Sequence, residues 1–236
     1  MTVVLAGVHA VKHAVRFGAV LDRLISADPA AALAILQTVA PDIAARVAIG
    51  PAAAGRVAAD PDVTGRVTVE LMSADEVERL AGGRADLVGL ARRPVTVRTG
   101  TGPTVLLDNP RHLGNLGAVV RVAAGFGARA VLSTGTVDPW HPTVVRAAAG
   151  LHFAVDVRRV TEVPDRVVAF DPAGDDLRSA TIPDDAVLAF GSERHGLSPE
   201  VRARAERTLA IPIRPGVSSY NLATSVAVAL YAWTAR

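Results

Sequence analysis

Three polar segments of the sequence hold the residue types and spacings from which chemistry is expected. They are Asp108–Gly127, Gly191–Glu200 and Ile211–Trp233, and each follows a short apolar stretch typical of a buried strand. In open α/β sheets, ligands bind beyond the carboxyl ends of the strands. The three segments are therefore candidates for parts of one functional site.

The first segment contains an asparagine and an arginine close together. Arg121 interrupts the apolar pattern Val119–Ala124, where a charge is costly unless it is paired. It is therefore either a functional cation or one half of a structural ion pair. Asn115 lies six residues earlier, where it either caps a helix or takes part in a site. The glycines Gly114 and Gly117 do not form the G-x-G-x-x-G pattern of dinucleotide-binding folds.

The second and third segments add carboxylate, imidazole, hydroxyl and amide groups. Glu193 and His195 lie between glycines, which allow the backbone to approach a ligand closely. Glu193 either orients Arg121, binds a ligand or faces solvent. His195 is either a general base or an ordinary polar loop residue. In the third segment, Ser219 and Asn221 precede a predicted helix, and either of them could be only its N-cap.

Apolar strands alternate with helices in the second half of the chain. Strands are predicted at Thr104–Leu107, Ala130–Ser133, Val167–Phe170, Val187–Phe190 and Thr208–Ile211. Helices are predicted at Leu116–Phe126, Thr143–Ala149, Pro199–Glu206 and Leu222–Ala235. This alternation predicts an α/β fold with a mostly parallel sheet covered by helices. The last helix is almost uncharged, so it requires burial on more than one side.

The first half of the chain predicts a smaller α/β unit. Strands are predicted at Val3–Leu5, Leu24–Ser26, Val67–Leu71 and Leu87–Ala91, with helices at Val8–Phe17 and Ala30–Val39. A further helix begins at the capping-box pattern Ser73–Glu76. Proline, glycine and threonine without apolar periodicity indicate a linker at 92–103. We therefore expect one domain over 1–91 and another over 104–236.

The composition excludes several classes of protein. A chain of 236 residues that is 50% hydrophobic, with a net charge of +2, is not disordered. The absence of cysteine excludes disulfides, thiol catalysis and Cys-ligated zinc, and we expect no metal. No apolar run approaches the ~20 residues that cross a bilayer. Without a recognisable leader at its start, a cytoplasmic protein is the expectation.

Arginine dominates the basic residues. Lys12 is the only lysine among 25 basic residues. Codon bias in a GC-rich genome explains this skew, because the sequence is also rich in alanine, valine and glycine. The arginine content alone therefore does not predict nucleic-acid binding.

Together, three motifs within these segments resemble those of the SpoU-type ribose 2′-O RNA methyltransferases of the SPOUT class. They are N-L-G-A-V-V-R at Asn115–Arg121, F-G-S-E-R-H-G-L-S at Phe190–Ser198 and I-P-I-R-P-G-V-S-S-Y-N-L at Ile211–Leu222. The resemblance covers residues 104–236. It departs beside the key positions, where Arg194 replaces a frequent glycine, Tyr220 a leucine or methionine, and Ala223 a serine.

The resemblance implies a C-terminal α/β domain with a deep trefoil knot, S-adenosylmethionine as cofactor, RNA as substrate, and a homodimer formed through this domain. It implies catalytic roles for Asn115, Arg121, Glu193, Ser219 and Asn221. It implies a cofactor pocket formed by Thr134, Gly191, Ser192, Glu193, Ile211, Ser219, Tyr220 and Leu222. Since a guanidinium is essentially always protonated, Arg121 is expected to stabilise a developing 2′-alkoxide and hold a phosphate rather than act as a base.

Residues 1–91 resemble, more faintly, a ribosomal-protein-like substrate-binding domain, best at Gly7–Val15 and Leu87–Ala91. By analogy this favours ribosomal RNA over transfer RNA. Arg111 and the pairs Arg92–Arg93 and Arg158–Arg159 are candidates for phosphate contacts, or else form a solvated face. Two alternatives stay open. One is a catalytically silent, knotted RNA-binding protein, and the other is an unrelated doubly wound nucleotide-binding protein.

Overall fold

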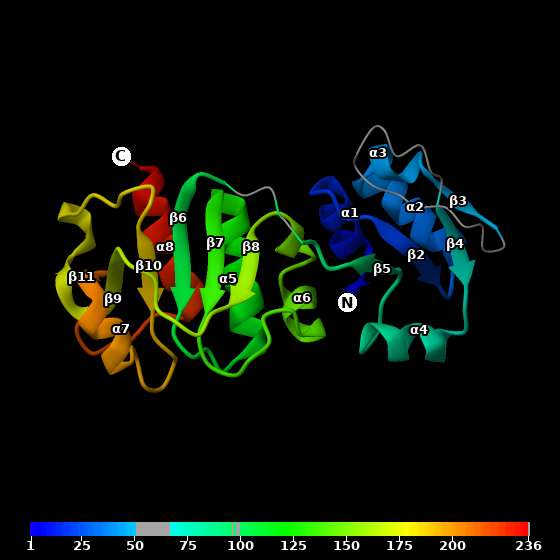
Figure 1. Ribbon diagram of the computed structural model, residues 1–236. Coiled ribbons are helices and arrows are strands. Elements are labelled where there is room, and N and C mark those ends of the chain that lie inside the picture. The colour runs from blue at the N-terminus through cyan, green and yellow to red at the C-terminus, as the bar shows by residue number, and fades with distance from the viewer. Residues whose placement is uncertain (51–66, 96, 98–99, 236) are drawn as a thin grey trace. The chain divides into compact units, whose positions relative to one another are not determined.

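A computed structural model describes residues 1–50, 67–95, 97 and 100–235 of the chain. Residue contacts divide it into two compact units (Figure 1). The first comprises Met1–Val97 and Ala148–Ala154, and the second Arg98–Ala147 and Val155–Arg236. The short segment Ala148–Ala154 therefore belongs with the first unit, although the sequence predicts one continuous domain over 104–236. Gly150 explains part of this assignment, because its backbone lies close against the carbonyl of Ala10.

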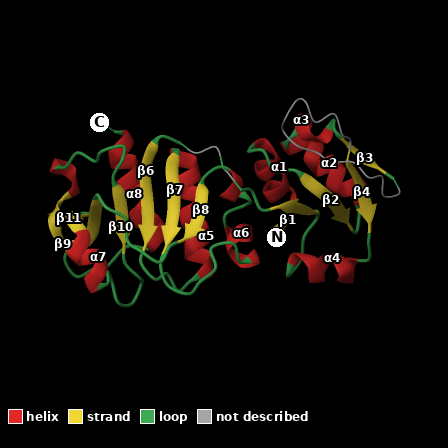
Figure 2. Ribbon diagram, viewed as in Figure 1, coloured by secondary structure: helices red, strands yellow, loops and turns green. Residues whose placement is uncertain are grey.

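The first unit is a mixed α/β structure (Figure 2). Its described elements are β1 (Thr2–Ala6), α1 (Val8–Arg16), β2 (Leu21–Ser26), α2 (Pro29–Val39), α3 (Pro41–Ala44), β3 (Val47–Ile49), β4 (Val67–Leu71), α4 (Ala74–Ala81) and β5 (Val88–Arg92). They form a sheet of order β1-β5-β2-β4-β3, in which β5 is antiparallel to both of its neighbours. The predicted elements of this half are confirmed, and α3 and β3 are additional.

Local capping explains where two of these helices begin. The Ser73 side chain accepts from the Glu76 backbone N–H, and the Glu76 carboxylate accepts from the Ser73 backbone, so the predicted capping box is confirmed at α4. Asp28 caps α2 by accepting from the Ala31 N–H, and Pro29 occupies the first helical position.

The second unit is built on a parallel sheet. Its described elements are β6 (Gly102–Leu107), α5 (Leu113–Phe126), β7 (Ala128–Ser133), α6 (Pro142–Ala147), β8 (Asp156–Arg159), β9 (Val167–Asp176), β10 (Val187–Phe190), α7 (Pro199–Arg204), β11 (Ala205–Ala210) and α8 (Leu222–Thr234). The strand order is β11-β9-β10-β6-β7-β8, and every neighbouring pair is parallel. The predicted parallel α/β class is confirmed for this unit.

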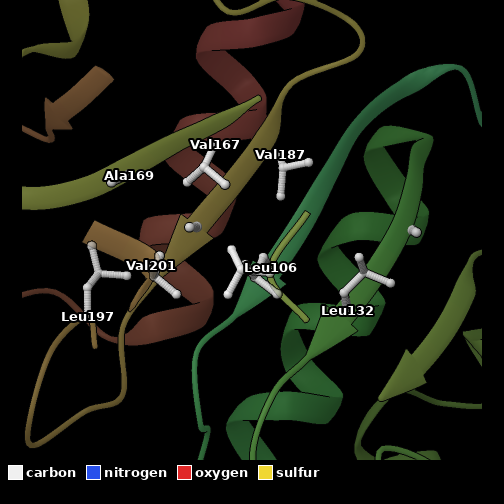
Figure 3. Close-up of a cluster of buried hydrophobic side chains, with 10 residues drawn as sticks. Leu106, Leu132, Val167, Ala169, Val187, Leu197 and Val201 are labelled. Atoms are coloured by element: carbon white, nitrogen blue, oxygen red, sulfur yellow. The ribbon is translucent and has the colours of Figure 1, made fainter. Parts of the chain in front are cut away.

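A dry core holds this sheet to α7. Figure 3 shows Leu106, Val167 and Val187 from neighbouring strands, together with Leu197 and Val201 from the segment that leads into and through α7. All five are buried. Because a parallel sheet is covered on both faces, its strands are apolar throughout, which is why they were recognisable as short apolar runs.

On the other face of the sheet, α5 and α8 pack together (Figure 1). The Trp233 ring near the end of α8 lies against Gly102 at the start of β6. At the other end, Asn221 caps α8 and its side chain contacts Asn115 in the first turns of α5. The last helix therefore runs back along β6, and this explains why its sequence is almost free of charge.

The prediction missed β8, and several boundaries differ from it, most of all around α7, β9 and β11. The helix predicted at Pro199–Glu206 ends at Arg204, and β11 follows at once from Ala205. Strand β9 continues past the predicted Phe170 to Asp176 and pairs there with the end of β11. Among the described residues, no helix is long and apolar enough to cross a membrane.

Candidate functional site

A cavity of about 550 Å³ lies at the carboxyl end of the parallel sheet. Its walls come from Phe170–Pro172, Phe190–Glu193, Gly196–Leu197, Ala210–Ile213, Ser218–Leu222 and Ser225. Three consecutive strands of the sheet, β10, β9 and β11, each lead into one of these walls. The volume is within the usual range for small-molecule sites. Two of the three polar segments predicted to meet therefore line one cavity.

The first polar segment joins this cavity through a chain of side-chain hydrogen bonds. The Asn115 amide group Nδ2 donates to Glu193 Oε1 at 2.8 Å. Asn221 Nδ2 donates to Asn115 Oδ1 at 3.1 Å. Asn221 Oδ1 then accepts from the Ala223 N–H at 2.9 Å, which caps α8. The chain Ala223–Asn221–Asn115–Glu193, here called the amide relay, ties all three motifs together.

The chemistry of its ends makes the amide relay directional. An ionised carboxylate only accepts hydrogen bonds, so Asn115 must present its NH₂ group to Glu193. A backbone N–H only donates, so Asn221 must present its oxygen to Ala223. The remaining oxygen of Asn115 and NH₂ group of Asn221 are then complementary. Protonation of Glu193 would remove the requirement that Asn115 present its NH₂ group to this carboxyl.

The environment of Glu193 favours its ionised form. Burial raises the pKa of this carboxyl, but the hydrogen bond from Asn115, the backbone N–H groups of Glu193 and Arg111, and the charge of His112 together lower the pKa below its ordinary value. Because folding lowers this pKa, the ionised carboxylate stabilises the fold above the ordinary value of 4.5. That stabilisation is lost as the pH falls through the lowered pKa.

Replacing Asn115 with alanine is expected to raise the pKa of Glu193. The substitution removes the strongest favourable hydrogen bond and leaves the effect of burial in place. A titration of the side-chain carboxyl carbon by NMR, in wild type and variant, measures the shift. If the pKa of Glu193 were unchanged or lower in the variant, the hydrogen bond from Asn115 would not be the main interaction that stabilises the ionised carboxylate.

The second motif forms a tight turn that presents Glu193. Ser192 and Gly196 pair through two backbone hydrogen bonds of 3.0 Å. Gly196 has φ of +64°, which favours glycine. Gly191 packs so closely under the turn that a Cβ atom there would lie 2.1 Å from the carbonyl carbon of Gly196. Both glycines are therefore required by backbone geometry.

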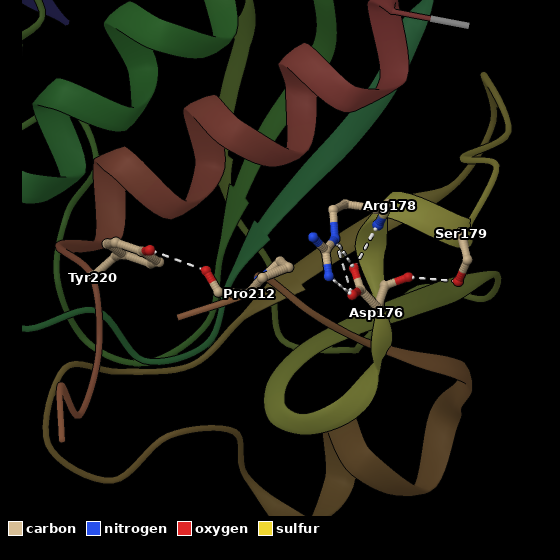
Figure 4. Close-up of polar contacts among 5 residues, drawn as sticks. All are labelled: Asp176, Arg178, Ser179, Pro212 and Tyr220. Carbon is tan, nitrogen blue, oxygen red and sulfur yellow. Dashed lines mark hydrogen bonds and ion pairs between the residues drawn. The ribbon is translucent and has the colours of Figure 1, made fainter. Parts of the chain in front are cut away.

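The third motif is an irregular segment held by a tyrosine. Figure 4 shows the Tyr220 hydroxyl donating to the Pro212 carbonyl, at 3.0 Å. Within the described chain, residues 211–220 make one backbone–backbone hydrogen bond, from the Val217 N–H to the Arg214 carbonyl. Apart from these groups and the Pro212 carbonyl, the backbone polar groups of this wall make no described backbone–backbone hydrogen bond and are available to a ligand. Tyr220, which departs from the motif pattern, holds the two ends of the segment together.

Figure 4 also shows a second local cluster in the same unit. Asp176, at the end of β9, accepts from the Arg178 side chain, and its backbone carbonyl accepts from the Ser179 hydroxyl at 2.9 Å. The Asp176 carboxylate also accepts from the Arg178 backbone N–H, which caps the short 3₁₀ helix Leu177–Ser179. This cluster ends the strand and makes no contact with the amide relay.

The cofactor residues expected from the motif resemblance divide into two groups. Seven of the eight line the cavity, namely Gly191, Ser192, Glu193, Ile211, Ser219, Tyr220 and Leu222. Thr134 lies apart in another hollow, where its hydroxyl donates to Asp108 Oδ1 at 2.9 Å and accepts from the Asn109 N–H. Of the expected catalytic residues, Asn221 also lines the cavity, whereas Asn115 and Arg121 do not.

Two interpretations of α5 require correction. Asn115 is not its N-cap, because the helix begins earlier and His112 occupies the capping position. Arg121 is exposed rather than held in an apolar environment. Among the described residues it makes no ion pair or hydrogen bond, so Glu193 does not orient it. The buried residues near Arg121 lie on other faces of the helix.

Asp108 is a site residue that the sequence reasoning did not single out. It directly follows β6, is 5% exposed, and accepts from the Ser198 N–H at 2.6 Å. This bond fixes the end of the second motif to the start of the first polar segment. Its position immediately after a buried strand, at the same edge as the other motifs, was the signal that could have identified it.

The fold and the cavity define a parallel α/β domain with a ligand-sized cavity at the carboxyl ends of its strands. Residues 102–231 match the model of the SpoU rRNA Methylase family. The match covers more than half of the chain, which therefore belongs to this family.

Known relatives are enzymes that act on RNA. The chain is 29% identical over 177 residues to the 23S rRNA (uridine(2479)-2′-O)-methyltransferase of Streptomyces viridochromogenes, covering 68% of this chain and 56% of the relative. It is 32% identical over 199 residues to the mouse mitochondrial rRNA methyltransferase 3, covering 58% and 48%. The chain spans about half the length of the curated relatives it matches.

Solved structures share the fold over nearly the whole chain. The SpoU methyltransferase AviRb from Streptomyces viridochromogenes, in complex with the cofactor AdoMet, aligns with a TM-score of 0.73 and 22% identity. The alignment covers 99% of this chain and 90% of that one. An rRNA methyltransferase from Sinorhizobium meliloti, also bound to AdoMet, aligns with a TM-score of 0.70 and 23% identity.

Proposed function

We propose that this protein transfers a methyl group from S-adenosylmethionine to a ribose 2′-hydroxyl of RNA, with ribosomal RNA as the substrate. The observation that carries the proposal is the amide relay, which joins the three family motifs at one ligand-sized cavity. Membership in the SpoU family and relatives named as 2′-O-methyltransferases of ribosomal RNA support it.

The cavity has the character that S-adenosylmethionine requires. Ile211 and Leu222 offer an apolar surface for the adenine, and the segment 211–220 offers unpaired backbone groups for its polar edges. Ser219, Asn221 and Glu193 supply polar groups for the amino-acid end. Sites of this kind are mostly apolar with a few well-placed polar groups. When bound, the cofactor supplies a methyl group activated by a sulfonium.

The residues of the chain position and stabilise the attacking oxygen. Arg121 is proposed to donate hydrogen bonds to the 2′-oxygen as negative charge develops on it, and to an adjacent phosphate. Its exposure and lack of a described partner leave the guanidinium able to do so. A phosphate oxygen or water accepts the hydroxyl proton. The amide relay holds Asn115 and Glu193 in fixed orientations beside the methyl-transfer site.

We infer that the path from β11 to α8 forms part of a trefoil knot. The chain leaves an edge strand of the sheet, crosses the ends of β9 and β10, and enters α8 behind β6.

We further propose a homodimer formed through α8. Val228 and Tyr231 are 37% and 65% exposed on this uncharged helix, whose buried residues are Leu222, Val226, Ala229 and Leu230. Exposed apolar patches of this kind typically mark an interface.

Replacing Tyr231 with aspartate is expected to convert the dimer to a monomer. A charge placed at the centre of an apolar interface leaves an uncompensated buried carboxylate. Light scattering after gel filtration should give twice the chain mass of 24.4 kDa for wild type and a single mass for the variant. Ile35→Asp, an equally drastic change on exposed α2 in the first unit, should leave the mass unaltered. If the Tyr231→Asp protein is still a dimer, the dimer interface does not include this face of α8.

The function itself is tested in two measurements. Calorimetry should show binding of S-adenosylmethionine but not of NAD or ATP, which separates this proposal from an unrelated nucleotide-binding protein. Mapping of 2′-O-methylation in total RNA from cells with and without the gene should then reveal a missing methyl group on ribosomal RNA. Cofactor binding without any lost methylation would instead support a catalytically silent RNA-binding protein.

A further inference from the structure

Charge pairing divides the arginines of the second unit into two groups. Five of them form ion pairs with carboxylates, namely Arg158 with Asp156, Arg166 with Asp185, Arg178 with Asp176, Arg202 with Asp171 and Arg204 with Asp165. A paired arginine must leave its carboxylate before it can bind a phosphate, and that carboxylate repels the phosphate. These five are therefore poor sites for a nucleic-acid backbone.

The three motif segments contain the opposite arrangement. Arg111, Arg121, Arg194 and Arg214 are all exposed, and none of them makes an ion pair with any residue that the structure describes. Among the described residues, the carboxylates of the same segments, which include the exposed Glu200, form no ion pair with them. Asp108 is buried against Thr134 and Ser198, and Glu193 is bound to Asn115.

Three of these arginines, Arg111, Arg194 and Arg214, lie beside residues that line the cavity. The backbone N–H of Arg111 contacts Glu193, and Arg194 follows Glu193 directly, so both residues lie beside a residue that lines the cavity. Arg214 begins the turn closed by the Val217 N–H, within the segment that forms a wall of the cavity.

We propose that Arg111, Arg194 and Arg214 form the surface that binds the RNA phosphates flanking the target nucleotide, in addition to the phosphate contact proposed for Arg121. This rests on the proposed function and names the part of the surface that receives the RNA backbone. A guanidinium presents a planar pair of donors that matches phosphate oxygens. Of the sequence-based candidates, Arg111 is retained, whereas Arg92, Arg158 and Arg159 fit this role less well. Arg92 pairs with Asp22 and Arg158 with Asp156, and Arg159 donates to the Thr136 carbonyl.

The test is the salt dependence of binding to a single-stranded RNA of mixed sequence, about 30 nucleotides long. Each phosphate contact on a single strand contributes about 0.7 to the slope of log affinity against log salt. The double variant Arg194→Gln/Arg214→Gln should reduce this slope by about 1.4. Between 0.05 M and 0.2 M salt, its affinity should therefore fall about sevenfold less than that of wild type.

The chain offers a matched control in Arg129→Gln/Arg207→Gln. Both residues are exposed and lack a described carboxylate partner, but they lie toward the amino ends of β7 and β11, away from the cavity. The control removes the same charge and should leave the slope unchanged. Equal slope changes in the two variants, or a change in the control alone, would overturn the inference.

A failure of the proposed function looks different. In that case wild type itself would not bind S-adenosylmethionine in calorimetry, whatever its RNA affinity. Both double variants are expected to bind the cofactor like wild type, because none of the four side chains lines the cavity. If the Arg194→Gln/Arg214→Gln protein binds the cofactor normally and keeps the full salt slope, the phosphate surface is wrong while the activity stands.

Discussion

Arg121→Ala is expected to lower the rate of methyl transfer by about 10²- to 10³-fold, the usual effect of removing one donor to a developing oxyanion. The cofactor affinity should stay near that of wild type, because Arg121 does not line the cavity. Stability should also change little, since the side chain is exposed and makes no described polar contact. Single-turnover transfer of a radiolabelled methyl group, calorimetry and thermal unfolding measure the three quantities.

Two further variants sharpen this expectation. Arg121→Lys keeps the charge but loses the planar fork, so it should recover only part of the rate. Arg129→Ala removes an exposed arginine at the far end of the sheet and should leave the rate unaltered. Full activity in Arg121→Ala would refute its assigned role, whereas a loss of cofactor binding would show that the helix itself had been disturbed.

Gly191→Ala is expected to abolish cofactor binding and to destabilise the second unit by about 1–3 kcal/mol, the usual cost of overpacking. The added Cβ would lie 2.1 Å from the Gly196 carbonyl carbon and 2.4 Å from the Leu197 nitrogen. These are backbone atoms of the turn that presents Glu193, so relief of the clash must open that turn. Thermal unfolding and calorimetry check both effects.

Gly125→Ala is the matched control for this substitution. Gly125 lies within α5, and no atom lies within 4 Å of a Cβ placed there. Alanine should stabilise the helix by up to about 1 kcal/mol and leave cofactor binding intact. Normal cofactor affinity in Gly191→Ala would mean that the turn tolerates the change and that its geometry does not control the site.

The parallel sheet was predictable because its strands are short apolar runs bounded by turn residues. Strand β10 was predicted with the observed bounds, and every other predicted strand of the sheet overlaps an observed one. The boundary between α7 and β11 was not predictable, because Arg204 and Ala205 join a helix to a strand without any glycine or proline between them.

Arg121 shows how sequence neighbours can mislead. Val119 and Val120 are buried, yet Arg121 points to a different face of the same helix, which it shares with Gly114 and Gly125. Burial follows the helical period of 3.6 residues rather than adjacency in the chain. The sequence identified the motif residues of the site, but it did not predict the hydrogen bonds between their side chains. The partner of an amide depends on which way it faces, and the relay joins residues 78 and 106 positions apart.

The order of the walls along the chain has a consequence for synthesis on the ribosome. The sheet has all its described strands once Ala210 has emerged, but the cavity still lacks the wall from Ile211 to Ser225. Ligand binding stabilises only a chain that can bind. The nascent second unit must therefore hold its sheet together by core packing alone. A bound ligand can stabilise this unit against proteolysis only after the segment from Ile211 to Ser225 has completed the cavity.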